Sequence, residues 1–170
     1  MAKLNGQNII LVSGPCGVGK STITKLLAQE LKRTVLIEGD VIADMFKGKQ
    51  QLDWDSILRL TWETIVTLTK NFINNDFDVI IDYVVEEEWE WFCQQLEDSK
   101  VNIHYVVLRA DESVLKERIQ DRGDVELIDR SLFLLNKLEN KPENMNRLYD
   151  TSNKHPDDIL QDLKTRFDVN

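Results

Sequence analysis

Eight residues near the start of the chain, Gly14 to Ser21, have the types and spacing of a phosphate-binding loop. They form the pattern Gly-x4-Gly-Lys-Ser, directly after the apolar run 8–13 and directly before an amphipathic stretch. In this pattern the glycines let the backbone curl so that its N–H groups face a phosphate, and the dipole of the following helix adds positive potential. Lys20 would place its ammonium against the β- and γ-phosphates, and Ser21 would offer its hydroxyl to Mg²⁺. A glycine-rich turn without a ligand is the alternative.

The longer motif from Ser13 to Thr22 resembles the phosphate loop of the nucleoside-monophosphate-kinase-like group of P-loop proteins. Shikimate kinases, gluconate kinases, chloramphenicol phosphotransferases and adenylate kinases belong to that group. The resemblance covers nearly the whole chain in the order and spacing of its motifs. It implies ATP and Mg²⁺ as cofactors, a five-stranded parallel sheet in the order 2-3-1-4-5, and a mobile lid that closes over ATP. It also implies that the nucleotide is contacted along the loop, by Gly14, Pro15, Cys16, Gly17, Val18, Gly19, Lys20, Ser21 and Thr22.

Two arginines further along the chain share one face of a predicted helix. Arg118 and Arg122 are four residues apart, so their side chains lie on the same side. The stretch resembles the arginine-bearing helix that leads into the lid of adenylate-kinase-like proteins. That resemblance implies that Arg118 packs on the adenine and that Arg122 stabilises charge on the γ-phosphoryl group. Arg130 would be a third cation of a lid around residues 121–131. A solvated helix with ordinary ion pairs, such as Arg118 with Asp121, is the alternative.

Two aspartates are placed to act on the phosphates or on an acceptor. Asp82 ends the third apolar run, where a carboxylate would hold the hydration shell of Mg²⁺. Asp40 follows the second run, and in the resembled small-molecule kinases an aspartate here contacts the acceptor hydroxyl. Such a carboxylate orients the hydroxyl and accepts its proton. The alternatives are a turn-forming role for Asp82 and a helix N-cap role for Asp40, with Glu38 and Asp44 as weaker candidates for the acceptor.

The sequence lacks the arginines that would hold a phosphorylated acceptor. In nucleotide-monophosphate kinases one such arginine stands three residues after the position of Asp40, where this chain has Ala43. Another stands shortly after the third strand, where this chain has Tyr83–Glu88. Because a buried phosphate without cationic partners is costly, a nucleotide acceptor is disfavoured and a neutral or partly cationic hydroxyl compound is favoured. Arg59 lies roughly where shikimate kinases hold the carboxylate of their substrate, which makes it a substrate-binding candidate; an ordinary surface arginine is the alternative.

An acidic stretch follows the third apolar run. Residues 84–99 hold six carboxylates and no Lys or Arg; the carboxylates are Glu86, Glu87, Glu88, Glu90, Glu97 and Asp98. The dipole at a helix start favours acids by itself, which explains most of the stretch without a ligand. The alternative is an acidic wall for a positively charged acceptor, such as an amino sugar or an aminated antibiotic, with Trp89 and Trp91 stacking on it. The sequence leaves open whether the stretch 86–98 touches the substrate.

Strand-length apolar runs alternate with longer helical patterns, which is typical of an α/β fold with three layers, a parallel sheet covered by helices. The expected strands are 8–13, 34–38, 77–82, 101–108 and 147–150, and the expected helices are 20–32, 54–74, 86–97, 112–121, 130–139 and 156–167. No repeat or linker divides the chain, so one domain over 1–170 is predicted. The resemblance places the loop 150–153 around the adenine; a helix-capping turn before Pro156 is the alternative.

Composition narrows the partners and the compartment. The net charge of −9 argues against a general nucleic-acid or anionic-membrane surface, which would need clustered positive charge. The two cysteines, Cys16 and Cys93, are simplest as reduced thiols, since a disulfide at Cys16 would pin the phosphate loop. The stretch Met1–Gln7 lacks the layout of a signal peptide, and no apolar run reaches the ~18 residues of a membrane span. We therefore expect a cytoplasmic protein.

Together these patterns predict an ATP-dependent kinase that transfers a phosphoryl group to a hydroxyl of a sugar-like, acid or antibiotic-type small molecule. Its catalytic residues would be Lys20, Asp40 and Arg122, its metal ligands Ser21 and Asp82, and its acceptor contacts Asp40, Arg59 and Asp82. The alternatives are a nucleotide or nucleoside kinase, a toxin-type kinase acting on nucleotide sugars, and a regulatory P-loop ATPase. The sequence does not distinguish ATP from GTP, a monomer from a homodimer, or one acceptor from another.

Overall fold

The structure is a computed structural model that describes residues 6–169. Its centre is a five-stranded sheet in the order β2-β3-β1-β4-β5, and every neighbouring pair of strands is parallel. The strands are β1 (Asn8–Ser13), β2 (Thr34–Glu38), β3 (Asp78–Asp82), β4 (Asn102–Arg109) and β5 (Leu148–Asp150). The predicted α/β fold and strand order are confirmed.

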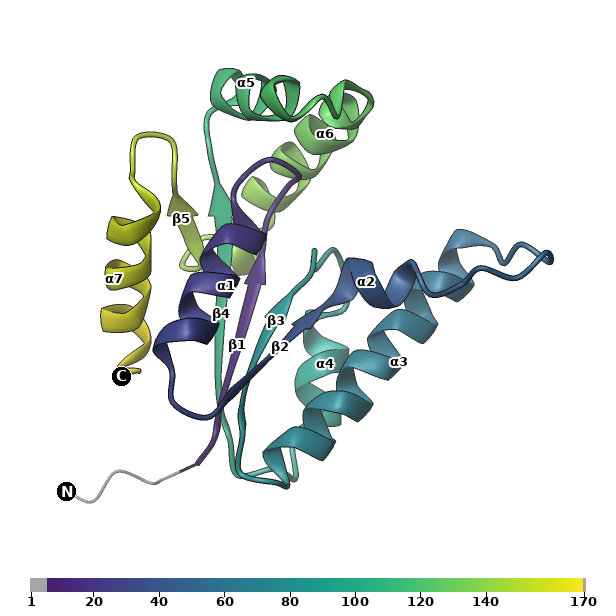
Figure 1. The fold of residues 1–170 in the computed structure, drawn as a ribbon, viewed down its shortest axis with the longest axis vertical. Coiled ribbons are helices and arrows are strands. Elements are labelled where there is room, and N and C mark those ends of the chain that lie inside the picture. The colour runs from purple at the N-terminus through teal and green to yellow at the C-terminus, as the bar shows by residue number, and fades with distance from the viewer. Residues whose placement is uncertain (1–5, 170) are drawn as a thin grey trace.

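Helices cover both faces of this sheet (Figure 1). α1 (Lys20–Glu30) and α7 (Pro156–Phe167) lie on one face, and α3 (Trp54–Ile73) and α4 (Trp89–Gln95) lie on the other. The short α2 (Gly39–Ala43) follows β2, and α5 (Glu112–Arg122) and α6 (Ile128–Glu139) follow β4. Two 3₁₀ turns, η1 (Val125–Leu127) and η2 (Pro142–Asn144), flank α6. The chain therefore forms the three layers expected from alternating strands and helices.

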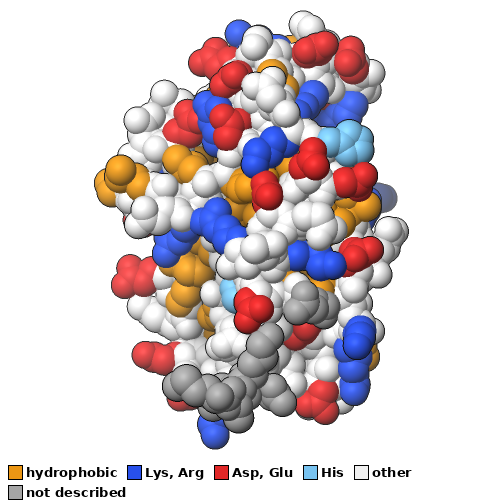
Figure 2. Space-filling view, turned by 90° about the vertical axis from the view of Figure 1, so that its left-hand side faces the viewer, with side chains coloured by type: hydrophobic (Ala, Val, Ile, Leu, Met, Phe, Trp, Pro, Cys, Tyr) orange, Lys and Arg blue, Asp and Glu red, His pale blue; other side chains and the backbone are white. Residues whose placement is uncertain are grey.

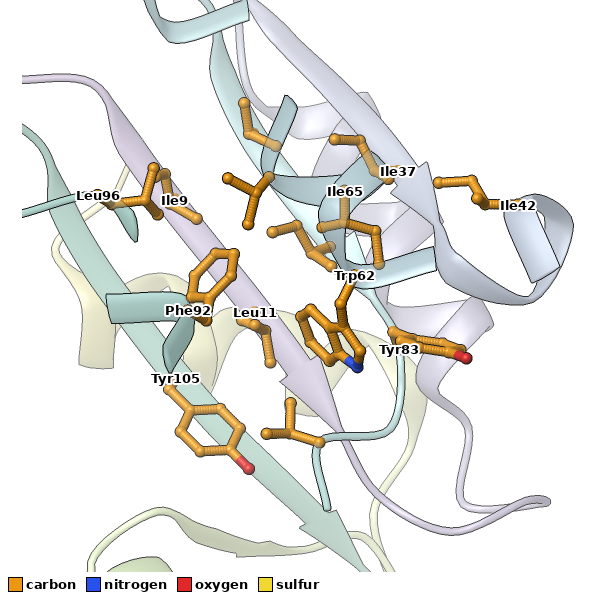
Figure 3. Close-up of a cluster of buried hydrophobic side chains, with 14 of the residues drawn as sticks. Ile9, Leu11, Ile37, Ile42, Trp62, Ile65, Tyr83, Phe92, Leu96 and Tyr105 are labelled. Carbon is orange, nitrogen blue, oxygen red and sulfur yellow. The ribbon is translucent and has the colours of Figure 1, made fainter. Parts of the chain in front are cut away.

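The central strands are apolar on both sides because helices bury both faces of the sheet. In β1, Ile9 and Leu11 pack toward α3 and α4, while Ile10 and Val12 pack toward α1 and α7. Figure 3 shows the first of these clusters, in which the fully buried Trp62 of α3 lies among the strand side chains. This packing fixes the sheet and leaves the carboxyl ends of the strands to carry polar side chains.

One helix prediction needs correction at its start. The acidic helix was expected from residue 86, but α4 begins at Trp89. The Glu88 carboxylate accepts hydrogen bonds from the backbone N–H groups of Glu86 (2.9 Å) and Glu87 (3.0 Å), and this local bonding competes with helical bonding. The first two acids of the stretch therefore lie in a turn rather than at a helix start.

The surface around α7 carries acidic and basic side chains in mixed order (Figure 2). Most of the stretch Met1–Gln7, on which the expectation of no signal peptide rests, lies outside the described residues. Within residues 6–169, no helix combines the length and the apolar character that a bilayer crossing demands.

Candidate active site

The loop between β1 and α1 adopts a backbone that only glycine takes without strain at several points. Gly14 has φ 143° and Gly19 has φ 104°, both in the positive region that other residues rarely adopt. A Cβ on Gly14 would lie 2.5 Å from the carbonyl oxygen of Leu108, so the loop also needs glycine for space. The predicted curl of residues 14–19 is present, and it ends at the N-terminus of α1.

The Lys20 side chain lies inside this curl. Its ammonium donates hydrogen bonds to the carbonyl oxygens of Gly14 (2.8 Å) and Pro15 (3.1 Å), and the residue is only 9% exposed. Its charge is therefore held at the mouth of the first helix, at the point where the helix dipole also favours an anion.

Asp82 lies beside this cation at the end of β3. The residue is 5% exposed, and its carboxylate accepts a hydrogen bond from the Thr24 hydroxyl at 3.4 Å. Burial raises the pKa of Asp82, while the positive charge of Lys20 and a hydrogen bond from Ser21 act in the opposite direction. The structure thus brings Lys20, Ser21 and Asp82 together.

The donor set at this point suits Mg²⁺. Mg²⁺ keeps several of its waters and takes one or two protein oxygens together with substrate phosphates. Ser21 supplies a hydroxyl and Asp82 a carboxylate, and the two side chains are close enough for Ser21 to lower the pKa of Asp82. Across the part of the chain that the structure describes, no group of three or more His, Cys, Asp and Glu side chains is placed to hold a metal by itself. A metal at Ser21 and Asp82 would therefore share its coordination with phosphate oxygens and water.

Asp40 faces the phosphate loop across a small cavity. The cavity has a volume of about 180 Å³. It is lined by Cys16, Gly17, Gly19, Lys20, Ser21, Thr22, Asp40, Arg122 and Leu127. α2 begins at Gly39 with Glu38 in the cap position, so the alternative of Asp40 as the N-cap is wrong. Of the weaker candidates, Glu38 pairs with Lys25 at 3.3 Å and Asp44 pairs with Lys47 at 2.5 Å.

A larger cavity of about 430 Å³ adjoins the first on the side of α5 and α7. It shares Gly17, Gly19, Thr22 and Arg122 with the smaller cavity. Its other lining residues are Val18, Ile23, Arg118, Asp121, Lys154, Pro156 and Ile159. Its volume falls in the range of small-molecule sites. Lys154, Pro156 and Ile159 were missed from the sequence, although the loop 150–153 just before them had been assigned to the adenine.

The Arg118 guanidinium is anchored where the loops meet. It donates to the carbonyl oxygens of Val18 (3.3 Å) and Thr151 (3.1 Å), and Thr151 is fully buried. These bonds hold one edge of the guanidinium, so Arg118 lines the larger cavity in a fixed position. The solvated-helix alternative is therefore wrong for Arg118, because its guanidinium bonds to the phosphate loop and to the loop after β5.

The other two predicted lid cations are held by acids. Arg122 lines both cavities and pairs with Asp124 at 3.2 Å. Arg130 pairs with Glu86, and its guanidinium lies 5.4 Å from the centre of the Phe133 ring. Arg130 lines neither cavity in this structure. The structure therefore groups Arg122 with the phosphate loop and places Arg130 on the segment after β3.

A third cavity, of about 290 Å³, lies between α3 and α4. It is lined by Asp55, Leu58, Arg59, Trp62, Glu88 and Trp91. The predicted acceptor residue Arg59 is thus at a cavity, and its guanidinium pairs with Glu63 at 2.9 Å. Trp62 also lines this cavity, whereas Trp54 is 57% exposed and does not.

Tyr83 is buried between Trp62, which lines this cavity, and Gly39, the neighbour of Asp40. Its ring packs against Trp62, with ring centres 5.4 Å apart. On its other side it packs so closely on Gly39 that a Cβ there would lie 2.3 Å from the ring. Burial, together with the negative charges of Asp40 and Glu88, raises the pKa of Tyr83 to about 12. Sequence reasoning missed this residue, because a tyrosine after a strand carries no signal of such contacts.

Comparisons with known proteins agree with this geometry. A family model described as an AAA domain matches residues 9–138. No curated protein matches the sequence.

Several solved structures share the fold. The tunicamycin resistance protein of Deinococcus radiodurans is 17% identical, with a TM-score of 0.72 over 96% of this chain and 97% of that one. A gluconokinase from Sinorhizobium meliloti 1021 is 18% identical, with a TM-score of 0.65 over 98% and 94%. A sugar kinase from Janibacter sp. HTCC2649 is 17% identical, with a TM-score of 0.66 over 96% and 95%. At these identities the likeness shows a P-loop kinase-like fold and no more.

Proposed function

This chain belongs to the AAA domain family, a P-loop family, and on that premise we propose that it is an ATP-dependent kinase acting on a hydroxyl of a small molecule. One observation carries the proposal: Lys20, Asp40 and Arg122 line one cavity that joins a second cavity large enough for a nucleoside. Two of the similar structures are named as a gluconokinase and a sugar kinase, which supports a kinase at the level of fold.

In the proposed reaction the acceptor oxygen attacks the γ-phosphorus, the bond from that phosphorus to the bridging oxygen breaks, and ADP leaves. Asp40 orients the hydroxyl and takes its proton. Lys20 and Arg122 stabilise the charge on the transferring group. Ser21 and Asp82 would hold Mg²⁺, which neutralises phosphate charge when bound. Arg118 and the residues of the larger cavity would hold the base of ATP.

Asp40 supports transfer to an acceptor rather than hydrolysis for its own sake. Asp40 lines the same cavity as Lys20 and Arg122 of the phosphate site, where a carboxylate can orient an acceptor hydroxyl and take its proton. A nucleotide acceptor is less well supported. The third cavity has Arg59 as its one cationic lining residue, and that guanidinium is paired with Glu63.

The acceptor would be a small molecule rather than a nucleic acid or a membrane surface, in keeping with the net charge of −9. Cys16 and Cys93 are free thiols in the structure, and free thiols are in keeping with a protein that acts in the reducing cytoplasm. The protein would act as a monomer or a homodimer.

The test is ADP release with Mg²⁺ and ATP across a panel of sugars, hydroxy acids and hydroxylated antibiotics. We expect release that depends on one class of acceptor, loss of turnover in Lys20→Ala, and a fall of ~10²-fold or more in Asp40→Asn, the usual scale for a lost base. Asp98→Asn is the control, since Asp98 is exposed beyond α4. Turnover that no acceptor changes would favour the ATPase alternative, and unaltered transfer by Asp40→Asn would remove Asp40 from the mechanism.

A further inference from the structure

The cavity between α3 and α4 has the size of a small polar ligand. At about 290 Å³ it lies at the lower end of the range of ligand sites, which suits a molecule of about one sugar ring. Figure 1 shows that α3 and α4 cover the same face of the sheet. The first two turns of α3 and the start of α4 supply the lining residues, so the cavity lies toward the carboxyl ends of the strands.

The charge of this cavity is negative. Asp55 and Glu88 line it with carboxylates, and the one lining cation is Arg59, which Glu63 already neutralises. Asp55 forms no ion pair within residues 6–169. One oxygen of Glu88 accepts the backbone N–H groups of Glu86 and Glu87, and in the described chain the other oxygen has no partner. An anionic ligand would therefore meet uncompensated negative charge, and a cation would relieve it.

The neighbouring acids of the sequence do not share this role. Glu86 pairs with Arg130 and with Lys137, and Glu87 pairs with Lys137 (2.9 Å) and Lys141 (2.8 Å). These pairs tie the segment after β3 to α6 and neutralise it. Of the acidic wall that the sequence offered as an alternative, only Glu88 lines this cavity, and it is joined there by Asp55 from α3, which no sequence pattern had connected with it.

Two aromatic side chains, Trp91 and Trp62, also line the cavity. Trp91 is half-buried at the cavity and presents an indole, whose π-face attracts cations. Trp62 is 2% exposed, and its indole nitrogen has no hydrogen-bond partner among the described residues. In Figure 3 this nitrogen lies at the edge of the ring toward Tyr83 and away from Phe92. A buried donor without a partner is unfavourable; the Trp62 side chain lines the cavity, while its nitrogen itself has almost no exposed surface.

From these contacts we infer, resting on the proposed function, that the acceptor is a hydroxylated small molecule with a protonated amine. The amine lies at Glu88 and Asp55 against Trp91, and the reacting hydroxyl lies at Asp40. Tyr83 stands between the two ends, because it packs on Gly39 next to Asp40 and feels the charges of both Asp40 and Glu88.

The test uses ligands that share a skeleton and differ in charge. Glucosamine, glucose and gluconate form one set, and serinol, glycerol and glycerate form another, each with a cationic, a neutral and an anionic member. Each is titrated calorimetrically into the full chain with Mg²⁺ and the β,γ-methylene analogue of ATP. We expect the amine of at least one set to bind ~10-fold or more tightly than its neutral partner, a difference typical of one charged contact. An anion that binds as tightly as the amine, or no binding by either amine, would overturn the inference.

Variants then assign the effect to the cavity. Glu88→Gln keeps an oxygen for the two backbone N–H groups but removes the charge, so we expect amine affinity to fall ~5–50-fold while the neutral ligand changes less than ~2-fold. Glu90→Gln, two residues away and exposed on α4, should change neither. Equal weakening of both ligands by Glu88→Gln would mean a structural role and would overturn the inference. If Glu88→Gln does not fold, Asp55→Asn carries the same comparison.

Binding and turnover separate the two proposals. Preferential amine binding without ADP release on ATP would contradict the proposed kinase function and leave the assignment of the cavity standing. ADP release that depends on an anionic acceptor would support the proposed kinase function and overturn the inference that the acceptor carries an amine.

Discussion

At the scale of single residues, Asp82 shows a conflict between stability and function. Burial raises its pKa, so the folded protein carries an ionised group that it accommodates poorly. We predict that Asp82→Asn increases the free energy of unfolding at neutral pH by roughly 0.5–2 kcal/mol, a range usual when a strained functional group is relieved. The same variant should lose most Mg²⁺-dependent turnover.

Urea unfolding of the ligand-free protein measures the first effect, and ADP release over a range of Mg²⁺ concentrations measures the second. Thr24 can still donate to the amide oxygen of the asparagine, so the local hydrogen bond survives the change. A variant that is less stable than the parent would show that Lys20 stabilises the carboxylate by more than burial costs it.

Gly39 carries a second prediction at this scale. A Cβ there would lie 2.3 Å from the Tyr83 ring, and the ring cannot retreat freely because Trp62 packs behind it. Gly39→Ala should therefore cost ~1–3 kcal/mol of stability, as overpacking does in cores, and should lower kcat by displacing the adjacent Asp40. Gly48→Ala is the matched control, since its nearest neighbour would be 3.9 Å away. Urea unfolding compares the stability of the two variants, and acceptor-dependent ADP release compares their kcat. Equal stability and equal kcat would contradict the close contact of Gly39 with Tyr83.

Some site residues could be predicted from sequence because their signal is local. Lys20 and Ser21 belong to one short motif, and Asp82 ends an apolar strand, so each position follows from chain direction alone. Glu88 and Asp55 were not paired in advance because α3 and α4 come together only through packing around Trp62. Contacts between side chains of distant helices leave no mark in spacing.

At the scale of elements, the strands were the most predictable part of the chain. A central strand of a parallel sheet is buried on both of its faces, so it reads in sequence as a continuous apolar run, as these strands do. The predicted start of α4 was wrong because the Glu88 carboxylate accepts hydrogen bonds from the backbone N–H groups just before it. This bonding competes with helical bonding, and helix propensity does not describe it. The short helix that Asp40 would have capped begins at Gly39 instead, and the ends of so short a helix are hard to place from sequence.

The end of α5 depends on a glycine, and the loss of stability on replacing that glycine can be measured. Gly123 closes the helix in the left-handed region at φ 81°, directly after Arg122, and a Cβ there would meet no atom within 4 Å. Gly123→Ala should thus lose ~1–2 kcal/mol through backbone strain alone. Thermal unfolding measures the loss, and Gly48→Ala, whose φ is not positive, is the control. If Gly123→Ala left the stability unchanged, α5 would be able to end in another conformation.

At the scale of the whole molecule, the two halves of the site draw on different parts of the fold. On the proposed function, the nucleotide side would be built by β1, α1, α5 and the loop before α7, and the acceptor side by α2, α3 and α4. The sheet between them carries a hydrophobic cluster on each face, and the strand ends of β2 and β3 lie side by side in register at Glu38 and Asp82. On the proposed function, nucleotide and acceptor would therefore meet at one edge of the sheet.

Because the nucleotide side joins elements from both ends of the chain, ATP should stabilise the whole fold. At a MgATP concentration of ~100 Kd, linkage predicts an increase of about 2.7 kcal/mol in the free energy of unfolding. For a chain of this size that corresponds to a rise in Tm of ~5–11 °C. Lys20→Ala should lose the shift, since the ammonium inside the loop is the main cation facing the phosphates, whereas Lys32→Ala, exposed beyond α1, should keep it. Thermal unfolding of the three proteins with and without MgATP compares them, and a full shift in Lys20→Ala would place the triphosphate away from the phosphate loop.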